Sequence, residues 1–327
     1  MEKWESQILV LYVLLFVCLL GGQIKKMKYT LFFLFLLQNI DSFALEQRSV
    51  TVQGRSRIYL IHIPKTKNPD KPLPLVLMLH GTGGSAENSS RYYGWIEKAE
   101  QESFTIVFGE GTPRDPTQPA HQDHNPNIWN DGFQPNNKNL SNDTLYLQTV
   151  IDNVANSTPI DRKRIFCTGF SNGASMCFRA GVELSQSIAA IAPVSGNLWL
   201  SHPKPARPIS MMLITGDADL LNPIHKTKAN TATGHIRNVL PPIFTTINKW
   251  LRIIGARPES KEVVEAKGIK LIHYGKTASG KEVFVIILAG QKHDWPGRDI
   301  IFTDSYEKPP KPLLYATETI WDFFKSQ

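Results

Sequence analysis

The segment Arg164–Gly173, with the sequence RIFCTGFSNG, decides how this chain folds. Its first half, Arg164–Thr168, is typical of a short strand, and the residues from 172 to about 184 are typical of a helix. The residues between them match Gly-x-Ser-x-Gly, with Ser171 at the centre. The two glycines permit a strand–turn–helix connection so tight that the serine is presented at the end of the strand. The segment therefore predicts Ser171 as a nucleophile.

On either side of this segment, apolar runs alternate with helical patterns. A run such as Leu73–His80, which is mostly apolar, is typical of a central strand buried on both faces. Alternating strands and helices predict an α/β protein with a mostly parallel central sheet and helices on both faces. The predicted strands are Leu73–His80, Phe104–Phe108, Arg164–Thr168, Ile188–Val194, Ile209–Thr215 and Glu282–Leu288.

A glycine-rich loop follows the first of these strands, with the sequence His80-Gly81-Thr82-Gly83-Gly84. A nucleophilic serine that attacks a carbonyl group needs backbone N–H groups directed at the oxyanion. In this arrangement one donor follows the nucleophile and the other lies in such a loop. We therefore expect the amides of Asn172 and Thr82 to be the donors. A small shift of the loop would give the second role to Gly83.

The acid and the base are expected after two later strands. Asp217 and Asp219 both follow Ile209–Thr215, and His293 follows Glu282–Leu288. The order serine, acid, histidine is that of the α/β-hydrolase fold. His293 is therefore the predicted base, whereas His273 lies within a predicted strand and is interpreted as a packed or surface residue. The local pattern leaves both aspartates open as the acid.

Several stretches resemble the polyhydroxybutyrate depolymerase, feruloyl esterase and acetylxylan esterase group of secreted α/β-hydrolases. They are LVLMLHGTGGSAEN, WNDG at 129–132, GFSNGASM, IAAIAPVSGNLW, TGDADLLNP, GQKHDWPG and ATETIWDFF. The resemblance runs from about residue 72 to the C-terminus and implies Asp219 as the acid and His293 as the base. The sequence departs from the group after WNDG, where Phe133-Gln134-Pro135 stands in place of a frequent cysteine pair.

The resemblance implies a serine esterase that forms an acyl-enzyme and acts on short-chain hydroxyalkanoate or related esters, small or polymeric. Feruloyl or acetylxylan esters of plant polysaccharide are the alternative substrates. Two other hypotheses are a peptidase or lipase of the same fold and a binding protein without turnover. Trp129 and Trp295 are interpreted either as walls of the substrate pocket or as core residues. No cofactor is implied, and no metal is expected, because His121 and His124 lack a third ligand motif.

The residues before 45 are predicted to be a leader, and residues 45–327 a single domain. Gln7–Gly22 is apolar and borderline in length for spanning a bilayer. A second apolar run after Met27, with Ser42 and Ala44 before a cut at Leu45, has the pattern of a signal peptide. We therefore expect a secreted or periplasmic protein, with an N-terminal membrane anchor as the alternative.

The cysteines and the charge exclude some classes. There are only three cysteines, too few for a disulfide framework. Cys18 lies in the leader, and Cys167 and Cys177 flank the nucleophile. These two are interpreted as separate buried thiols, with a bridge as the alternative. The net charge is +7, but the basic residues are scattered and no nucleic-acid-binding motif accompanies them, so no nucleic-acid partner is expected.

Overall fold

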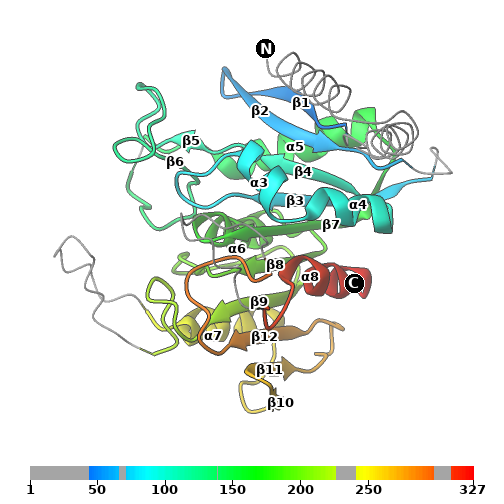
Figure 1. Ribbon diagram of the computed structural model, residues 1–327, viewed down its shortest axis with the longest axis vertical. Helices are drawn as coiled ribbons and strands as arrows, with labels where there is room; N and C mark the ends of the chain where they lie inside the picture. Colours follow the sequence, from blue (N-terminus) through cyan, green and yellow to red (C-terminus); the bar gives the residue numbers. More distant parts are fainter. Residues whose placement is uncertain (1–43, 66–70, 138, 226–240, 298–310) are drawn as a thin grey trace, which may run out of the picture. The chain divides into compact units, whose positions relative to one another are not determined.

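The computed structural model describes residues 44–65, 71–137, 139–225, 241–297 and 311–327 (Figure 1). Residues 45–327 form one compact unit. In the described residues, ten strands form one sheet in the order β1-β2-β4-β3-β7-β8-β9-β12-β11-β10, and β5 and β6 form a second, two-stranded sheet.

The strands of the described chain are β1 (Glu46–Val52), β2 (Arg55–His62), β3 (Leu73–Leu79), β4 (Thr105–Gly109), β5 (Thr112–Pro113), β6 (Asn127–Ile128), β7 (Ile160–Phe170), β8 (Ala190–Val194), β9 (Ser210–Gly216), β10 (Lys261–Ala266), β11 (Ile269–Tyr274) and β12 (Val283–Leu288). The helices are α3 (Ala86–Tyr92), α4 (Trp95–Glu102), α5 (Asp143–Ser157), α6 (Asn172–Glu183), α7 (Ile243–Ile254) and α8 (Ala316–Lys325).

The centre of the large sheet is parallel, and its two edges are antiparallel. Strands β4, β3, β7, β8, β9 and β12 pair in parallel. The hairpin β1–β2 joins one edge, and β11 and β10 join the other. Every residue of β3 and β9 is buried, as expected for parallel strands covered on both faces. The predicted mostly parallel sheet is therefore confirmed.

Alternate residues of the central strands point to opposite faces of the sheet, and each face packs against helices. Leu75 and Leu77 belong to the large core that also contains buried residues of α5, α6 and α7. On the other face, Phe166 of β7 stacks on Phe324 of α8, with ring centroids 4.6 Å apart. Because parallel strands end at a common edge, the loops after β3, β7, β9 and β12 converge there.

Cys167 and Cys177 form a disulfide, which corrects the expectation of two separate thiols. Cys167 lies on β7 and Cys177 on α6, and both are fully buried. The turn at Ser171 folds the helix back against its own strand, so the two Cα atoms lie 5.8 Å apart. That separation is within the range that a disulfide spans.

We expect Cys177→Ala to lower the free energy of unfolding by about 2–3 kcal/mol, because the bridge restricts the unfolded chain. Urea unfolding without reductant measures this difference. Reductant in the unfolding buffer should lower the stability of the wild type by a similar amount and leave the Cys177→Ala variant unchanged. Equal sensitivity of both proteins to reductant would contradict the bridge.

The predicted leader falls outside the described residues except for Ala44, so its cleavage stays a prediction. Within the described part of the chain, none of the helices has the length and apolarity needed to cross a bilayer.

Candidate functional site

Ser171 lies in the turn between β7 and α6 with φ 56° and ψ −117°. Positive φ is uncommon for a residue with a side chain and stores strain at a functional turn. The two flanking glycines make this turn possible. A Cβ atom on Gly169 would lie 2.7 Å from the Gly173 carbonyl carbon, and one on Gly173 would lie 2.6 Å from the Leu79 carbonyl carbon. The predicted strand–turn–helix is thus present, and Gly173 allows α6 to pass directly against the end of β3.

The three side chains predicted to act together form one hydrogen-bonded chain. The Ser171 hydroxyl lies 2.9 Å from Nε2 of His293. Nδ1 of His293 lies 2.9 Å from Oδ2 of Asp219. The residues are 122 and 74 positions apart in sequence, so only the convergence of the loops after β7, β9 and β12 brings them together. The Asp219 side chain is fully buried, and the His293 side chain is 18% exposed.

Backbone amides hold the carboxylate of Asp219. Its Oδ1 accepts hydrogen bonds from the N–H groups of Leu221 and Asn222, at 2.9 and 3.0 Å. Burial raises the pKa of Asp219. The opposing effects are larger: the hydrogen bond from His293, the positive charge of the protonated His293 ring and the two backbone amides together hold the pKa of Asp219 below its usual value. The carboxylate is therefore ionised at neutral pH and is oriented to stabilise a positively charged imidazole ring.

Asp217, the competing acid, is not part of the hydrogen-bonded series Ser171–His293–Asp219. It is exposed, and its Oδ1 accepts a hydrogen bond from the Gly290 amide at 2.7 Å. Asp217 therefore ties the loop after β9 to the loop after β12 and makes no contact with His293 in the described structure.

The glycine-rich loop after β3 lies against the nucleophile turn. A Cβ atom on Gly81 would lie 3.3 Å from the Ser171 Cβ. The Gly83 amide already donates to the Asn127 carbonyl at 2.8 Å, so it is not available to an oxyanion. Thr82 is exposed, and no hydrogen bond from its amide is found among the described residues. Of the two donors that the sequence left open in this loop, the geometry favours Thr82.

His80 fixes this loop through both ring nitrogens. Its Nε2 accepts from the Gly111 amide at 2.9 Å, so its Nδ1 carries the proton and donates to the Gly81 carbonyl at 2.7 Å. Burial lowers the pKa of His80 to about 4. The imidazole is therefore neutral near pH 7 and acts as a structural support for the loop.

Of the two interpretations left open for the tryptophans, pocket wall or core residue, their burial favours the core. Trp129 is 1% exposed, and its indole N–H donates to the His80 carbonyl at 2.9 Å. Trp295 is 2% exposed, and its indole N–H donates to Thr317 at 3.3 Å. Each indole can be buried without an unpaired polar group, because its N–H has a hydrogen-bond partner inside the protein.

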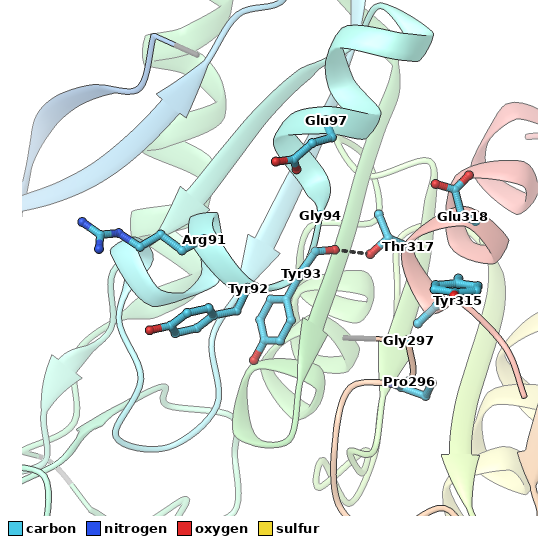
Figure 2. A pocket seen from close by; sticks show the side chains of 11 residues that line it. Arg91, Tyr92, Tyr93, Gly94, Glu97, Pro296, Gly297, Tyr315, Thr317 and Glu318 are labelled. Atoms are coloured by element: carbon cyan, nitrogen blue, oxygen red, sulfur yellow. Dashed lines mark hydrogen bonds between the residues drawn. The ribbon is translucent and has the colours of Figure 1, made fainter. Parts of the chain in front are cut away.

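A cavity of about 380 Å³ lies beside the loop that carries His293. Figure 2 shows its lining from the α3–α4 connection, from Pro296-Gly297 and from the start of α8. Aromatic contacts link it to the site: the ring of Tyr93, which lines the cavity, lies 6.5 Å from the ring of Phe170, and Phe170 lies 4.9 Å from the His293 ring. None of the three side chains lines this cavity.

Two buried asparagines, Asn197 and Asn222, were not predicted from the sequence. Asn222 donates to the Ser195 carbonyl at 2.8 Å and accepts from Asn197 at 2.5 Å. The buried pair joins the loops after β8 and β9. The signal available in the sequence was their position, since each lies just beyond the end of a central strand.

The described residues contain no group of three histidine, cysteine, aspartate or glutamate side chains that could hold a metal. His121 and His124 stack on each other, with ring centroids 4.7 Å apart.

Comparisons with known proteins identify related esterases. A relative from Nocardia uniformis subsp. tsuyamanensis, named "Putative esterase NocK", is 27% identical, over 84% of this chain and 81% of its own. Feruloyl esterase D of Neurospora crassa is 22% identical, with 84% of each chain covered. The solved acetyl xylan esterase from Aspergillus awamori shares the fold, with a TM-score of 0.57 at 14% identity, covering 86% of this chain and all of that one.

The profile of the phospholipase/carboxylesterase family matches residues 62–237, just over half of the chain. The predicted α/β-hydrolase fold and the resemblance to feruloyl and acetylxylan esterases are thereby confirmed. The chain belongs to the phospholipase/carboxylesterase family, and it is a carboxylic ester hydrolase.

Proposed function

We propose that Ser171, His293 and Asp219 hydrolyse carboxylic esters through an acyl-enzyme. The observation that carries this proposal is the unbroken hydrogen-bonded chain from the Ser171 hydroxyl to the buried Asp219 carboxylate. The hydroxyl is held at the open edge of the sheet, where a substrate carbonyl can reach it.

In the first half of the reaction, Ser171 Oγ attacks the carbonyl carbon and its proton passes to Nε2 of His293. The amides of Thr82 and Asn172 bind the oxyanion. Collapse of the tetrahedral intermediate breaks the bond to the alcohol oxygen, which takes the proton from His293. In the second half, water attacks the acyl group, gives a proton to His293 and releases the acid, and Ser171 regains its proton.

Esters of aromatic or acetyl groups on plant polysaccharide are the substrate class that the relatives favour, since Feruloyl esterase D matches over most of its length. Hydroxyalkanoate esters, which the sequence also suggests, are the second candidate. Their support is the string of sequence landmarks from GTGGSAEN to GQKHDWPG.

A substrate panel on the purified protein tests both classes. We expect turnover of p-nitrophenyl acetate, and a higher kcat/KM for either methyl ferulate and acetylated xylan or hydroxybutyrate oligomers. Labelling by a fluorophosphonate probe reports the nucleophile independently of the substrate. Amide-only turnover would indicate a peptidase, long-chain preference a lipase, and a protein neither labelled nor active would be a binding protein.

We further propose that the protein is exported. The leader pattern before Leu45 supports this, and so does the Cys167–Cys177 bridge, because disulfides persist mainly in oxidising compartments. N-terminal sequencing of the protein from the culture medium, the periplasm and the membrane fraction distinguishes a cleaved signal peptide from a membrane anchor. A cytoplasmic protein that begins at Met1 would contradict export.

A further inference from the structure

The segment 127–131 contacts both elements that carry the proposed oxyanion amides. On one side, the Asn127 carbonyl accepts from the Gly83 amide at 2.8 Å, and the Trp129 indole donates to the His80 carbonyl at 2.9 Å. These two bonds hold the loop two residues before Thr82 and one residue after it. On the other side, the same segment binds the side chain of Asn172.

Asn172 is the first residue of α6, directly after Ser171, and both ends of its side chain are engaged. Its Oδ1 accepts from the Trp129 amide at 2.7 Å. Its Nδ2 donates to the Trp129 carbonyl at 3.1 Å and to Oδ2 of Asp131 at 2.8 Å. A side chain bonded at three points cannot rotate freely, so the segment 129–131 fixes the direction in which the backbone of Asn172 leaves the turn.

Asp131 is 7% exposed, and each of its oxygens serves one N–H group. Oδ2 accepts from Asn172, and Oδ1 accepts from the Phe133 amide at 3.0 Å. Arg179, the neighbouring cation, is bonded to the Asn130 carbonyl and to Glu183. Burial raises the pKa of Asp131 to about 6, which means that keeping the ionised carboxylate at this position lowers the free energy of unfolding. A residue used only to fill space at this position would not need a charge.

We infer that Asp131 is a positioning residue for the proposed ester hydrolysis: through the Asn172 side chain it sets the amide of Asn172 at the correct distance from the amide of Thr82. The inference rests on the proposed function. Asp131 touches neither substrate nor the reacting atoms and acts only through Asn172. The segment 127–131 thus connects the loop that carries Thr82 to the side chain of Asn172.

Three variants test the pairing of Asp131 with Asn172. In Asp131→Asn an amide replaces the carboxylate, so one of the two N–H groups meets another donor. In Asn172→Asp a partly buried carboxylate faces the buried carboxylate of Asp131. In the double variant Asp131→Asn/Asn172→Asp, the new amide donates to the new carboxylate and still accepts from Phe133. The Trp129 carbonyl loses its donor in this variant, as it does in Asn172→Asp. The double variant has the same total charge at this pair as the wild type, whereas Asp131→Asn has one negative charge fewer and Asn172→Asp one more.

We expect each single variant to lower kcat for p-nitrophenyl acetate by about 10- to 100-fold, less than the loss of a whole oxyanion donor, with KM within about twofold. The double variant should have a kcat at least about fivefold above that of Asn172→Asp, because the two differ only in the pairing with residue 131. Thermal unfolding of each variant separates a loss of kcat from a loss of folded protein. A space-filling role would lower stability and leave kcat per folded molecule unchanged.

Wild-type kcat in Asp131→Asn would overturn the inference, as would a double variant no better than Asn172→Asp. If Asp131→Asn does not fold, the comparison of Asn172→Asp with the double variant still decides. Failure of the proposed function gives a different result: the wild type itself turns over none of the esters and takes no fluorophosphonate label.

Discussion

Replacing Ser171 by alanine is expected to lower kcat for p-nitrophenyl acetate by about 10⁵- to 10⁶-fold, because the acyl-enzyme cannot form without the hydroxyl oxygen. The residual rate is that of binding and oxyanion stabilisation alone. The fold should survive. Alanine has the same Cβ as serine, so the strain at φ 56° does not increase, and among the described side chains the hydroxyl forms a hydrogen bond only with His293.

The measurement is steady-state hydrolysis together with thermal unfolding and fluorophosphonate labelling. Ser187→Ala is the matched control, since Ser187 lies beyond the other end of α6 and its hydroxyl donates to Gln148 at 2.8 Å. The control should keep activity and label. Activity retained by Ser171→Ala, or label found on another serine, would show that the nucleophile is misassigned.

The nucleophile could be predicted from the sequence because its geometry is local. Two glycines, a preceding strand and a following helix determine where Ser171 lies, whatever the rest of the chain does. His293 could be predicted for a similar reason: it follows the last central strand, and such loops meet at one edge of a parallel sheet.

The features that the sequence did not predict depend on contacts between distant segments. The sequence left Trp129 open as a pocket wall or a core residue. It can be buried because the His80 carbonyl, 49 positions earlier, accepts its indole N–H. The disulfide required knowing how closely α6 returns to β7. Strand β10 has no buried residue, so no apolar pattern marked it, and only pairing with β11 reveals it.

The choice between Asp217 and Asp219 also depends on contacts between distant segments. Both follow β9, two positions apart, and the residue pattern alone favoured neither. The structure separates them because Gly216 packs directly against the backbone of Gln291, which brings the loops after β9 and β12 together. The turn then directs Asp217 towards the Gly290 amide and Asp219 towards His293.

Asp219→Asn is therefore expected to lower kcat by about 10⁴-fold, whereas Asp217→Asn should change it by about twofold or less. In Asp219→Asn, the amides of Leu221 and Asn222 keep the new carbonyl oxygen at the Oδ1 position. The new NH₂ group then faces Nδ1 of His293, which must act as an acceptor. The ring proton moves to Nε2, and His293 cannot take the proton of Ser171.

In Asp217→Asn, the amide oxygen still accepts from Gly290, and the exposed side chain loses only a solvated charge. The two substitutions are chemically identical and two residues apart, so each is the control for the other. Steady-state kinetics measures kcat, and urea unfolding shows whether either variant loses stability. Equal losses of activity, or a larger loss for Asp217→Asn, would show that the carboxylate orienting His293 is not Asp219.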